Sequence, residues 1–199
     1  MQHAEIKVHV IPTRGASPWS LRERIGLLLW DFAWGLFCGW TPKPFYPWRL
    51  MWLRLFGCKI HGKPFVHQRA RIQIPWHLTI HEGCSVGDRA NLYSLGRIEL
   101  RPRCVIAQEA YLCTGTHNFD DPTQTLITAA ITIGADAFIG ARAFVMPGIC
   151  IGDGVIVGAC SLVTKDVEDR MVVAGSPARF IRLREHSFEQ IRWEAQTAK

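Results

Sequence analysis

Aliphatic residues recur every six positions through the second half of the chain. Between residues 131 and 166 isoleucine or valine stands at each sixth position, and glycine directly follows four of them. The aliphatic members are Ile133, Ile139, Val145, Ile151, Val157 and Val163, and the glycines are Gly134, Gly140, Gly152 and Gly158. An α-helix repeats near 3.6 residues and an amphipathic strand repeats every two. A period of six therefore indicates repeated units that each contain a short strand and a corner.

The same spacing extends upstream in shorter groups. It links Ile60, Val66 and Ile72, then Ile80, Val86, Leu92 and Ile98, and then Ile106 and Leu112, with a slip of two residues between groups. The fourth residue after an aliphatic one is usually small, as at Ala70, Cys84, Ala90, Ala110, Ala137, Ala143 and Ser161. If three units close one coil, the aliphatic residues stack inward and the small residues let the chain turn. We therefore predict an all-β solenoid, a parallel β-helix of about five coils.

The repeat is interrupted once, between Leu112 and Ile131. The interrupting segment contains His117, whose neighbours include Gly115, Asn118, Asp120 and Asp121. Long insertions into a solenoid often carry function, because the coils hold them in place. An imidazole can accept a proton near neutral pH. We predict an active-site loop at 114–130 centred on His117, with Asp120 or Asp121 as a candidate to orient the ring and Asp120 also as a candidate acceptor-binding residue.

Composition divides the chain into three parts. Residues 1–57 contain six of the eight tryptophans and are predicted to form an apolar helical segment. Residues 58–181 contain the coils. In residues 182–199 apolar and aromatic side chains stand near helical spacing, which predicts a short terminal helix.

An apolar stripe in the N-terminal part allows two interpretations. Its members are Ile25, Leu27, Trp30, Trp34 and Phe37. Such a stripe commonly packs against the rest of the protein. With Arg22 and Arg24 at its start it also suits a helix that lies in a membrane interface, with peripheral contact through residues 20–55. The apolar run from 25 to 40 is interrupted by Asp31 and is shorter than the roughly 20 residues that a spanning helix needs, so we predict no transmembrane helix.

Charge and cysteine usage narrow the function classes. The formal net charge is +6, which suits a phosphate-bearing ligand, an acidic saccharide or an anionic membrane surface. The basic residues form no long run, so we expect no nucleic-acid partner. Seven cysteines without a C-x-x-C spacing argue against a disulfide framework and a zinc ribbon, and Cys84 and Cys104 are expected to fill the core. The first eighteen residues lack the apolar centre of a secretory signal, so we expect a cytoplasmic protein, with any peripheral contact on the inner face of the membrane.

Three features together resemble a known family. They are the six-residue repeat, the break carrying Thr-Gly-Thr-His117, and the closing run VAGSPAR at 173–179. The chain resembles the hexapeptide-repeat acyltransferases, which are left-handed β-helices, and within them the exopolysaccharide O-acetyltransferases of the colanic-acid biosynthesis type. The resemblance implies acetyl transfer from acetyl-coenzyme A to a sugar hydroxyl of a saccharide, lipid-linked glycan or exopolysaccharide precursor. It also implies a homotrimer whose active sites lie between neighbouring coils.

The resemblance also implies roles for individual residues. His117 matches the catalytic base, and Asn91 matches the acceptor-site asparagine of sugar O-acetyltransferases. Gly140 and Ala141 match the backbone that faces the thioester. The positions that match the coenzyme groove are Ala159, Thr164, Lys165 and Arg179. The N-terminal acidic residue of the small-sugar acetyltransferases has no evident counterpart, so the acceptor stays open.

These roles form a consistent chemical scheme. A sugar hydroxyl is a poor nucleophile, and a neutral imidazole at His117 would take its proton during attack on the thioester. A backbone N–H at the Gly140 corner would face the developing oxyanion. Lys165 and Arg179 would pair with the phosphates of the coenzyme. The scheme requires no metal.

Two other function classes compete with acetyl transfer. A γ-carbonic-anhydrase-like zinc enzyme uses the same coil with three histidine ligands, but here the fifth position after His117 is Pro122 and no nearby histidine completes a site. His77, His81 and Glu82 would match a zinc motif only on a helix, where the repeat predicts strands. A non-catalytic solenoid scaffold would explain the repeat but neither the histidine-bearing break nor the closing run.

Overall fold

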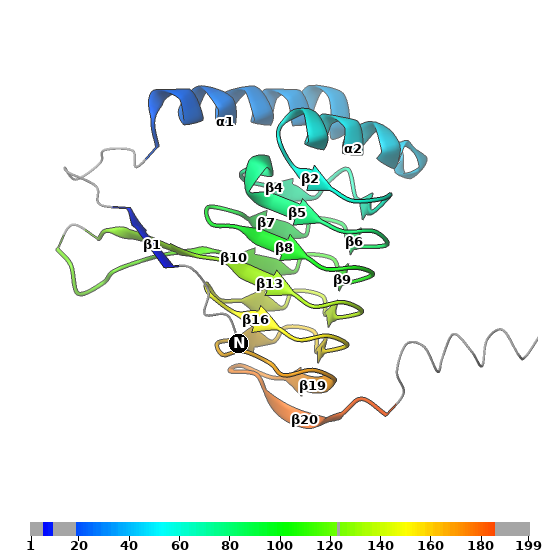
Figure 1. The fold of residues 1–199 in the computed structure, drawn as a ribbon, viewed down its shortest axis with the longest axis vertical. Helices are drawn as coiled ribbons and strands as arrows, with labels where there is room; N and C mark the ends of the chain where they lie inside the picture. The colour runs from blue at the N-terminus through cyan, green and yellow to red at the C-terminus, as the bar shows by residue number, and fades with distance from the viewer. Residues whose placement is uncertain (1–5, 10–18, 123, 186–199) are drawn as a thin grey trace, which may run out of the picture.

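The protein is a stack of β-coils with helices lying across one end (Figure 1). The computed structural model describes residues 6–9, 19–122 and 124–185. Helix α1 spans Leu21–Ala33 and continues into a π-helical turn at Trp34–Cys38, and helix α2 spans Tyr46–Leu55 after a 3-10 turn at Lys43–Phe45. All other described regular elements are strands, apart from a 3-10 turn at Pro75–His77.

Three parallel sheets form the sides of the stack. The first sheet contains β2 (Lys59–Ile60), β5 (Leu78–Ile80), β8 (Ile98–Leu100), β13 (Ile131–Ile133) and β16 (Cys150–Ile151). The second contains β3 (Phe65–Val66), β6 (Ser85–Val86), β9 (Val105–Ile106), β14 (Phe138–Ile139), β17 (Ile156–Val157) and β19 (Met171–Ala174), with β20 (Arg179–Leu183) antiparallel at its end. The third contains β4 (Arg71–Ile72), β7 (Asn91–Tyr93), β10 (Tyr111–Cys113), β15 (Phe144–Val145) and β18 (Leu162–Val163). The predicted parallel β-helix is confirmed, with five full coils and part of a sixth.

The six-residue aliphatic positions form the core of the stack. In the second sheet Val86, Ile106 and Ile139 pair in register, and each is fully buried. The six-residue spacing was wrong by two residues in the first sheet, where three steps of six match Ile80 with Ile98. The structure instead pairs Ile80 with Leu100 and Ile98 with Leu78. Since Ile98 and Leu100 are both buried, the pattern could not tell them apart. Cys84 and Cys104 fill the core as expected, and all seven cysteines are free.

Four of the corners between the second and third sheets share one conformation. In these four the residue before the small residue has a left-handed φ, at Arg89, Glu109, Arg142 and Cys160. The N–H of the small residue closes the turn, as from Ala143 to the Gly140 carbonyl (3.1 Å). A Cβ built at Gly140 would lie 2.6 Å from the Ala159 nitrogen of the next coil. The spacing of small residues therefore reflects a repeated tight turn.

The helical segment at residues 21–55 covers the first coil and is called the cap below (Figure 1). Ser20 and Glu23 form a capping box at the start of α1. Trp30, on the same helix, is 1% exposed and donates its indole N–H to the Ile72 carbonyl at 2.8 Å. Leu50 and Leu53 of α2 are buried in the same core. The helices thereby cover apolar surface that the first coil would otherwise expose, as terminal caps do in solenoids.

The side chains of the apolar stripe fall into two groups, one packed against the protein and one exposed. Trp30 is buried, and Leu27 and Trp34 are half-buried, so these three pack against the protein. Ile25 and Phe37 are exposed. A second set of apolar side chains, which the stripe did not include, also points outward: Leu21, Leu28, Leu29, Phe32, Leu36 and Trp40. The helix is thus apolar on both faces.

Two boundaries differ from the predicted segments. The N-terminal part is not helical throughout, because residues 6–9 form strand β1 (Ile6–His9), which pairs with a strand of the interrupting segment. At the other end Arg182 and Leu183 lie in β20, and residues 186–199, where most of the predicted terminal helix falls, lie outside the described residues. No helix among the described residues is long and apolar enough to cross a membrane.

Candidate active site

The segment that interrupts the repeat is a β-hairpin that projects from the third coil (Figure 1). Its strands are β11 (Gly115–His117) and β12 (Leu126–Ala129), which pair antiparallel, and β1 adds a third strand beside β12. At the base the Ala129 N–H donates to the Thr114 carbonyl at 2.9 Å, and Thr114 Oγ1 accepts from the Gly96 N–H at 2.8 Å. A Cβ at Gly115 would lie 2.7 Å from a methyl group of Leu95. The base is therefore tightly fitted to the coil.

A small apolar cluster links the hairpin to the cap. Leu126 of β12 is buried with Ile74 and Leu95. Leu27 of α1 and Trp76 of the 3-10 turn at Pro75–His77 pack on the same cluster. The hairpin thus rests on the first two coils and on the helix above them.

His117 lies at the end of β11 and is exposed. Its Nδ1 lies 2.6 Å from the Gln124 carbonyl oxygen. A carbonyl only accepts hydrogen bonds, so this contact assigns the proton of the neutral ring to Nδ1 and leaves Nε2 as the proton acceptor. Gln124 has a φ of 50°, in the left-handed region, and its N–H donates to the Asp121 carbonyl at 2.8 Å. A tight turn therefore places the carbonyl that orients the ring.

The two loop carboxylates do not orient His117. The Asp121 carboxylate accepts a hydrogen bond from the Thr125 hydroxyl. The Asp120 N–H donates to the Asn118 side chain at 3.1 Å, and Asp120 is exposed. Asp120 and Asp121 were only candidates for orienting the ring, and a backbone carbonyl occupies that position instead. An acceptor-binding role for Asp120 stays a prediction.

Four predicted site residues lie along one edge of the stack, where the second sheet turns into the third. Asn91 begins β7, is half-buried, and makes no side-chain hydrogen bond to the described residues. Gly140 and Ala141 form the same corner two coils further on, and Ala159 follows in the next coil. The Ala141 carbonyl accepts from the Cys160 N–H at 2.9 Å. These four residues contribute backbone groups and one amide side chain, that of Asn91, to the edge.

The Gly140 and Ala141 N–H groups differ in availability. Gly140 donates to the Val157 carbonyl at 2.8 Å and is therefore engaged in the stack. The Ala141 N–H has no hydrogen-bond partner among the described residues. Of this pair, Ala141 is thus the residue able to donate to a ligand.

The closing run VAGSPAR folds back onto this edge. The Ala178 N–H donates to the Leu162 carbonyl at 2.7 Å, and the Gly175 N–H donates to Ser161 Oγ at 3.1 Å. These bonds hold Arg179, which is exposed at the start of β20, near the last corner. Thr164 and Lys165 are also exposed but follow β18, at the other end of the third sheet.

The predicted residues therefore fall into two groups at opposite ends of the third-sheet strands. Asn91, Ala141 and Ala159 lie where these strands begin, whereas the His117 hairpin leaves β10 where it ends. Within one chain the imidazole and the Ala141 N–H are not side by side.

Sequence reasoning missed an aromatic ladder between the two groups. On the third sheet Tyr111 stacks on Phe144 at a centroid distance of 4.8 Å and lies 5.9 Å from Tyr93. Burial raises the pKa of Tyr111 to about 12, so its hydroxyl stays protonated. The signal was present, since Tyr111 and Phe144 directly precede inward aliphatic residues.

Metal ligands do not gather in the part of the chain that the structure describes. No group of three or more His, Cys, Asp or Glu side chains there is arranged to hold a metal ion. The three-histidine set of the zinc interpretation thus has no counterpart among residues 6–9, 19–122 and 124–185.

Known proteins match this chain in sequence. Residues 130–165 match the family described as bacterial transferase hexapeptide (six repeats). Over 160 residues the chain is 39% identical to the "Putative colanic acid biosynthesis acetyltransferase WcaF" of Escherichia coli (strain K12), and the match covers 80% of this chain and 88% of that protein.

Known structures match it in fold. A maltose O-acetyltransferase from Clostridium difficile 630 superposes with a TM-score of 0.75 at 24% identity, over 84% of this chain and 90% of that one. A hexapeptide-repeat-containing acetyltransferase from Vibrio cholerae O1 biovar eltor, solved with acetyl coenzyme A, has a TM-score of 0.75 at 20% identity, over 85% of this chain and 93% of that one. The sequence match over most of both chains confirms the resemblance, and the protein belongs to the hexapeptide-repeat acyltransferase family.

Proposed function

We propose that the protein is an O-acetyltransferase that moves acetyl from acetyl-coenzyme A to a sugar hydroxyl of a saccharide or exopolysaccharide precursor. The observation that carries this proposal is the oriented ring of His117, whose Nδ1 faces the Gln124 carbonyl. The similarity to a protein named for colanic acid biosynthesis supports the saccharide class.

His117 acts as the general base in this proposal. With Nδ1 facing a carbonyl, Nε2 accepts the proton of the attacking hydroxyl and then returns it to the departing thiolate, so the ring ends as it began. The coenzyme supplies the activated acetyl group as a thioester. The Ala141 N–H donates to the carbonyl oxygen on which charge develops. Lys165 and Arg179, both exposed, pair with coenzyme phosphates.

A second copy of the chain completes the site. Because His117 and Ala141 lie at opposite ends of the third sheet, a hairpin from one copy facing the edge of the next would bring them together. A homotrimer closes this head-to-tail contact by rotation and makes three equivalent sites. Each site then needs two copies, and dilution of the protein below the dissociation constant of the oligomer abolishes turnover.

The cap is proposed to hold the enzyme on the inner face of a membrane, beside a lipid-linked acceptor. Leu28 and Phe32 of α1 are 71% and 67% exposed, and Trp40, just after the π-helical turn, is 74% exposed, which is unusual for one surface. Arg22 and Arg24 are exposed at the start of α1, where they suit anionic headgroups.

Liposome sedimentation tests the membrane contact. Full-length protein should pellet with anionic vesicles at low salt, and Leu28→Ser with Phe32→Ser should abolish this. Phe138→Ser, which removes an exposed aromatic side chain on the coils, is the matched control. If the double variant still pellets, or changes the oligomeric state instead, the membrane contact is rejected.

Acetyl-coenzyme A turnover tests the activity itself. Thiol release should be measured against a panel of neutral, acidic and lipid-linked saccharides, with the acetylated hydroxyl located by NMR. Turnover should appear with at least one saccharide and should depend on His117. A folded protein that transfers acetyl to none of them contradicts the proposal.

A further inference from the structure

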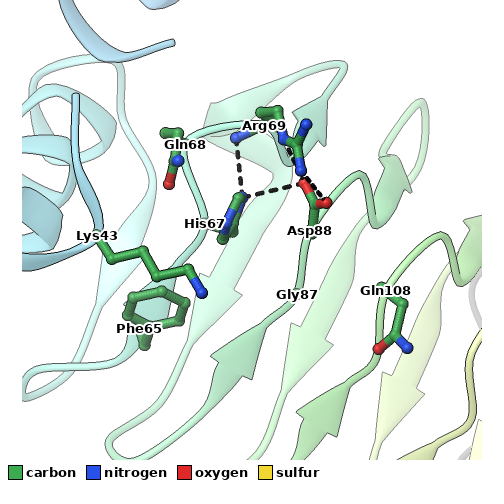
Figure 2. A pocket seen from close by; sticks show the side chains of 8 residues that line it. All are labelled: Lys43, Phe65, His67, Gln68, Arg69, Gly87, Asp88 and Gln108. Carbon is green, nitrogen blue, oxygen red and sulfur yellow. Dashed lines mark hydrogen bonds and ion pairs between the residues drawn. The ribbon is translucent and has the colours of Figure 1, made fainter. Parts of the chain in front are cut away.

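A hollow of about 520 Å³ lies on the edge of the first three coils, beneath the start of α2 (Figure 2). Its volume is within the range of small-ligand sites. Residues at its wall include Lys43, Phe65, His67, Gln68, Asp88 and Gln108. None of these was predicted as a site residue.

The hollow carries an excess of positive charge. The Lys43 side chain extends past the Phe65 ring into it, and Lys43 has no carboxylate partner among the described residues (Figure 2). The fully buried Arg49 guanidinium lies 6.0 Å from the centroid of the Phe65 ring. Arg49 donates to the Val66, Pro42 and Lys43 carbonyls and to the Thr41 hydroxyl, so no carboxylate neutralises it in the described structure.

The one carboxylate in the hollow is already paired. Asp88 accepts two hydrogen bonds from the Arg69 guanidinium, one of them at 2.7 Å. His67 is 6% exposed, and burial lowers its pKa, opposed by Asp88. Its Nδ1 lies 3.2 Å from the Arg69 backbone nitrogen and 3.3 Å from Asp88 Oδ1, so His67 is a further neighbour of the paired carboxylate. Lys43 and Arg49 therefore remain as uncompensated charges.

The other wall groups suit a polar ring. Gln68 Oε1 is covered from solvent and has no hydrogen-bond partner in the described structure. An unsatisfied buried acceptor costs free energy, which the Gln68 amide would recover by turning toward a ligand hydroxyl. Gln108 is exposed and presents a second amide, and the half-buried Phe65 offers an apolar face. Amides beside an aromatic ring match the alternating hydroxyl and C–H surfaces of a sugar.

The hollow is in line with the predicted site. His67, Gly87, Gly140 and Gly158 each follow an inward residue of the second sheet, and those residues pair in register down the stack. They form one row along the edge that carries Ala141 and Ala159. Asp88 precedes Asn91 on the same corner. The hollow is thus at the capped end of this edge, with the predicted coenzyme positions further along it.

We propose that this hollow binds an anionic saccharide unit of the acceptor, with Lys43 facing its carboxylate or phosphate and the glutamine amides facing its hydroxyls. The proposal rests on the proposed acetyltransferase function for the reason a saccharide is bound. Binding itself needs neither coenzyme nor acetyl transfer, so the two can fail separately.

Saturation-transfer and titration NMR on the intact protein, without coenzyme, test this proposal. The probes are a methyl hexuronide, the methyl hexoside of the same configuration, and the corresponding hexose 1-phosphate. Wild type should bind at least one anionic probe more tightly than the neutral one, with an advantage that falls as salt rises. Comparison of the two anionic probes identifies carboxylate or phosphate.

Lys43→Gln should weaken binding of the anionic probe about fivefold and leave the neutral probe unchanged, as expected for loss of one solvent-accessible ion pair. Lys59→Gln, which removes an exposed lysine outside the hollow, is the matched control and should change nothing. Gln108→Ala should weaken both probes alike. Equal binding of charged and neutral probes, or equal behaviour of the two lysine variants, overturns the proposal even if the enzyme transfers acetyl groups.

Discussion

The coils and the His117 hairpin hold their residues in place by different means. In the coils each inward residue is repeated above and below, and Val86, Ile106 and Ile139 are each fully buried between equivalent neighbours. In the hairpin nothing is repeated, and His117 is positioned by one turn and one carbonyl. The periodic part therefore carries the stability, whereas the proposed proton transfer belongs to the aperiodic part, so variants should separate the two.

The largest effect is expected inside the coils. Ile139→Asp places a charge without a partner in the core and should prevent folding. The free energy needed to desolvate the carboxylate exceeds the free energy of unfolding of a typical domain. Phe138→Asp is the matched control, since Phe138 is 42% exposed on the other face of the same strand. Thermal melts and gel filtration compare them. A soluble, cooperatively folded Ile139→Asp protein would contradict the inward stacking.

The hairpin should show the opposite behaviour. His117→Ala removes the proposed general base and should lower kcat by about 10² or more, while the thermal melt stays close to wild type because the side chain is exposed. His61→Ala, another exposed histidine, serves as the control in the first coil. Acetyl transfer and melting are measured on the same samples. Retention of most activity in folded His117→Ala would reject the base.

A smaller effect isolates the carbonyl that orients the ring. Gln124→Pro cannot adopt a φ of 50° and should move the carbonyl, lowering kcat about tenfold as positioning is lost. Gln124→Gly keeps that conformation and should retain activity. The Michaelis constant for acetyl-coenzyme A should be unchanged in both. If proline and glycine act alike, the carbonyl does not position His117.

The smallest effect concerns the exposed basic residues at the far end of the stack. Lys165→Ala or Arg179→Ala should raise the Michaelis constant for acetyl-coenzyme A several-fold and change kcat less, because such contacts are shared by ground and transition states. Arg182→Ala, also exposed on β20, is the control. A fall in kcat at constant Michaelis constant would place the residue in the chemical step instead.

The periodic part of the molecule could be predicted and the aperiodic part could not. Repetition made the inward set from Val66 to Val163 readable, because each position is tested by its neighbours in the stack. The pairing of residues 6–9 with 126–129 is non-local and left no pattern. The partner of His117 is a backbone carbonyl. Every residue has one, so the sequence does not indicate which carbonyl contacts the ring.

The buried face of the capping helices could not be predicted for a different reason. Helix α1 is apolar around most of its surface, so periodicity could not say which face is buried. Trp30 is enclosed because its indole reaches the Ile72 carbonyl, whereas Leu28 on the same helix is exposed. The hollow at Lys43 and His67 was missed because its residues come from the cap and three coils.

The cluster of Ile74, Leu95 and Leu126 affects how readily the hairpin opens and how fast its amide hydrogens exchange with solvent. Because Leu27 of α1 and Leu126 of the hairpin pack on one small cluster, the hairpin cannot open without giving up contacts that the cap also uses. The free energy of local opening at β12 therefore includes a share contributed by the cap. Amide hydrogens of the hairpin should therefore exchange more slowly whenever α1 is held in place. Any contact that immobilises α1 would reduce the motion of the hairpin that carries His117.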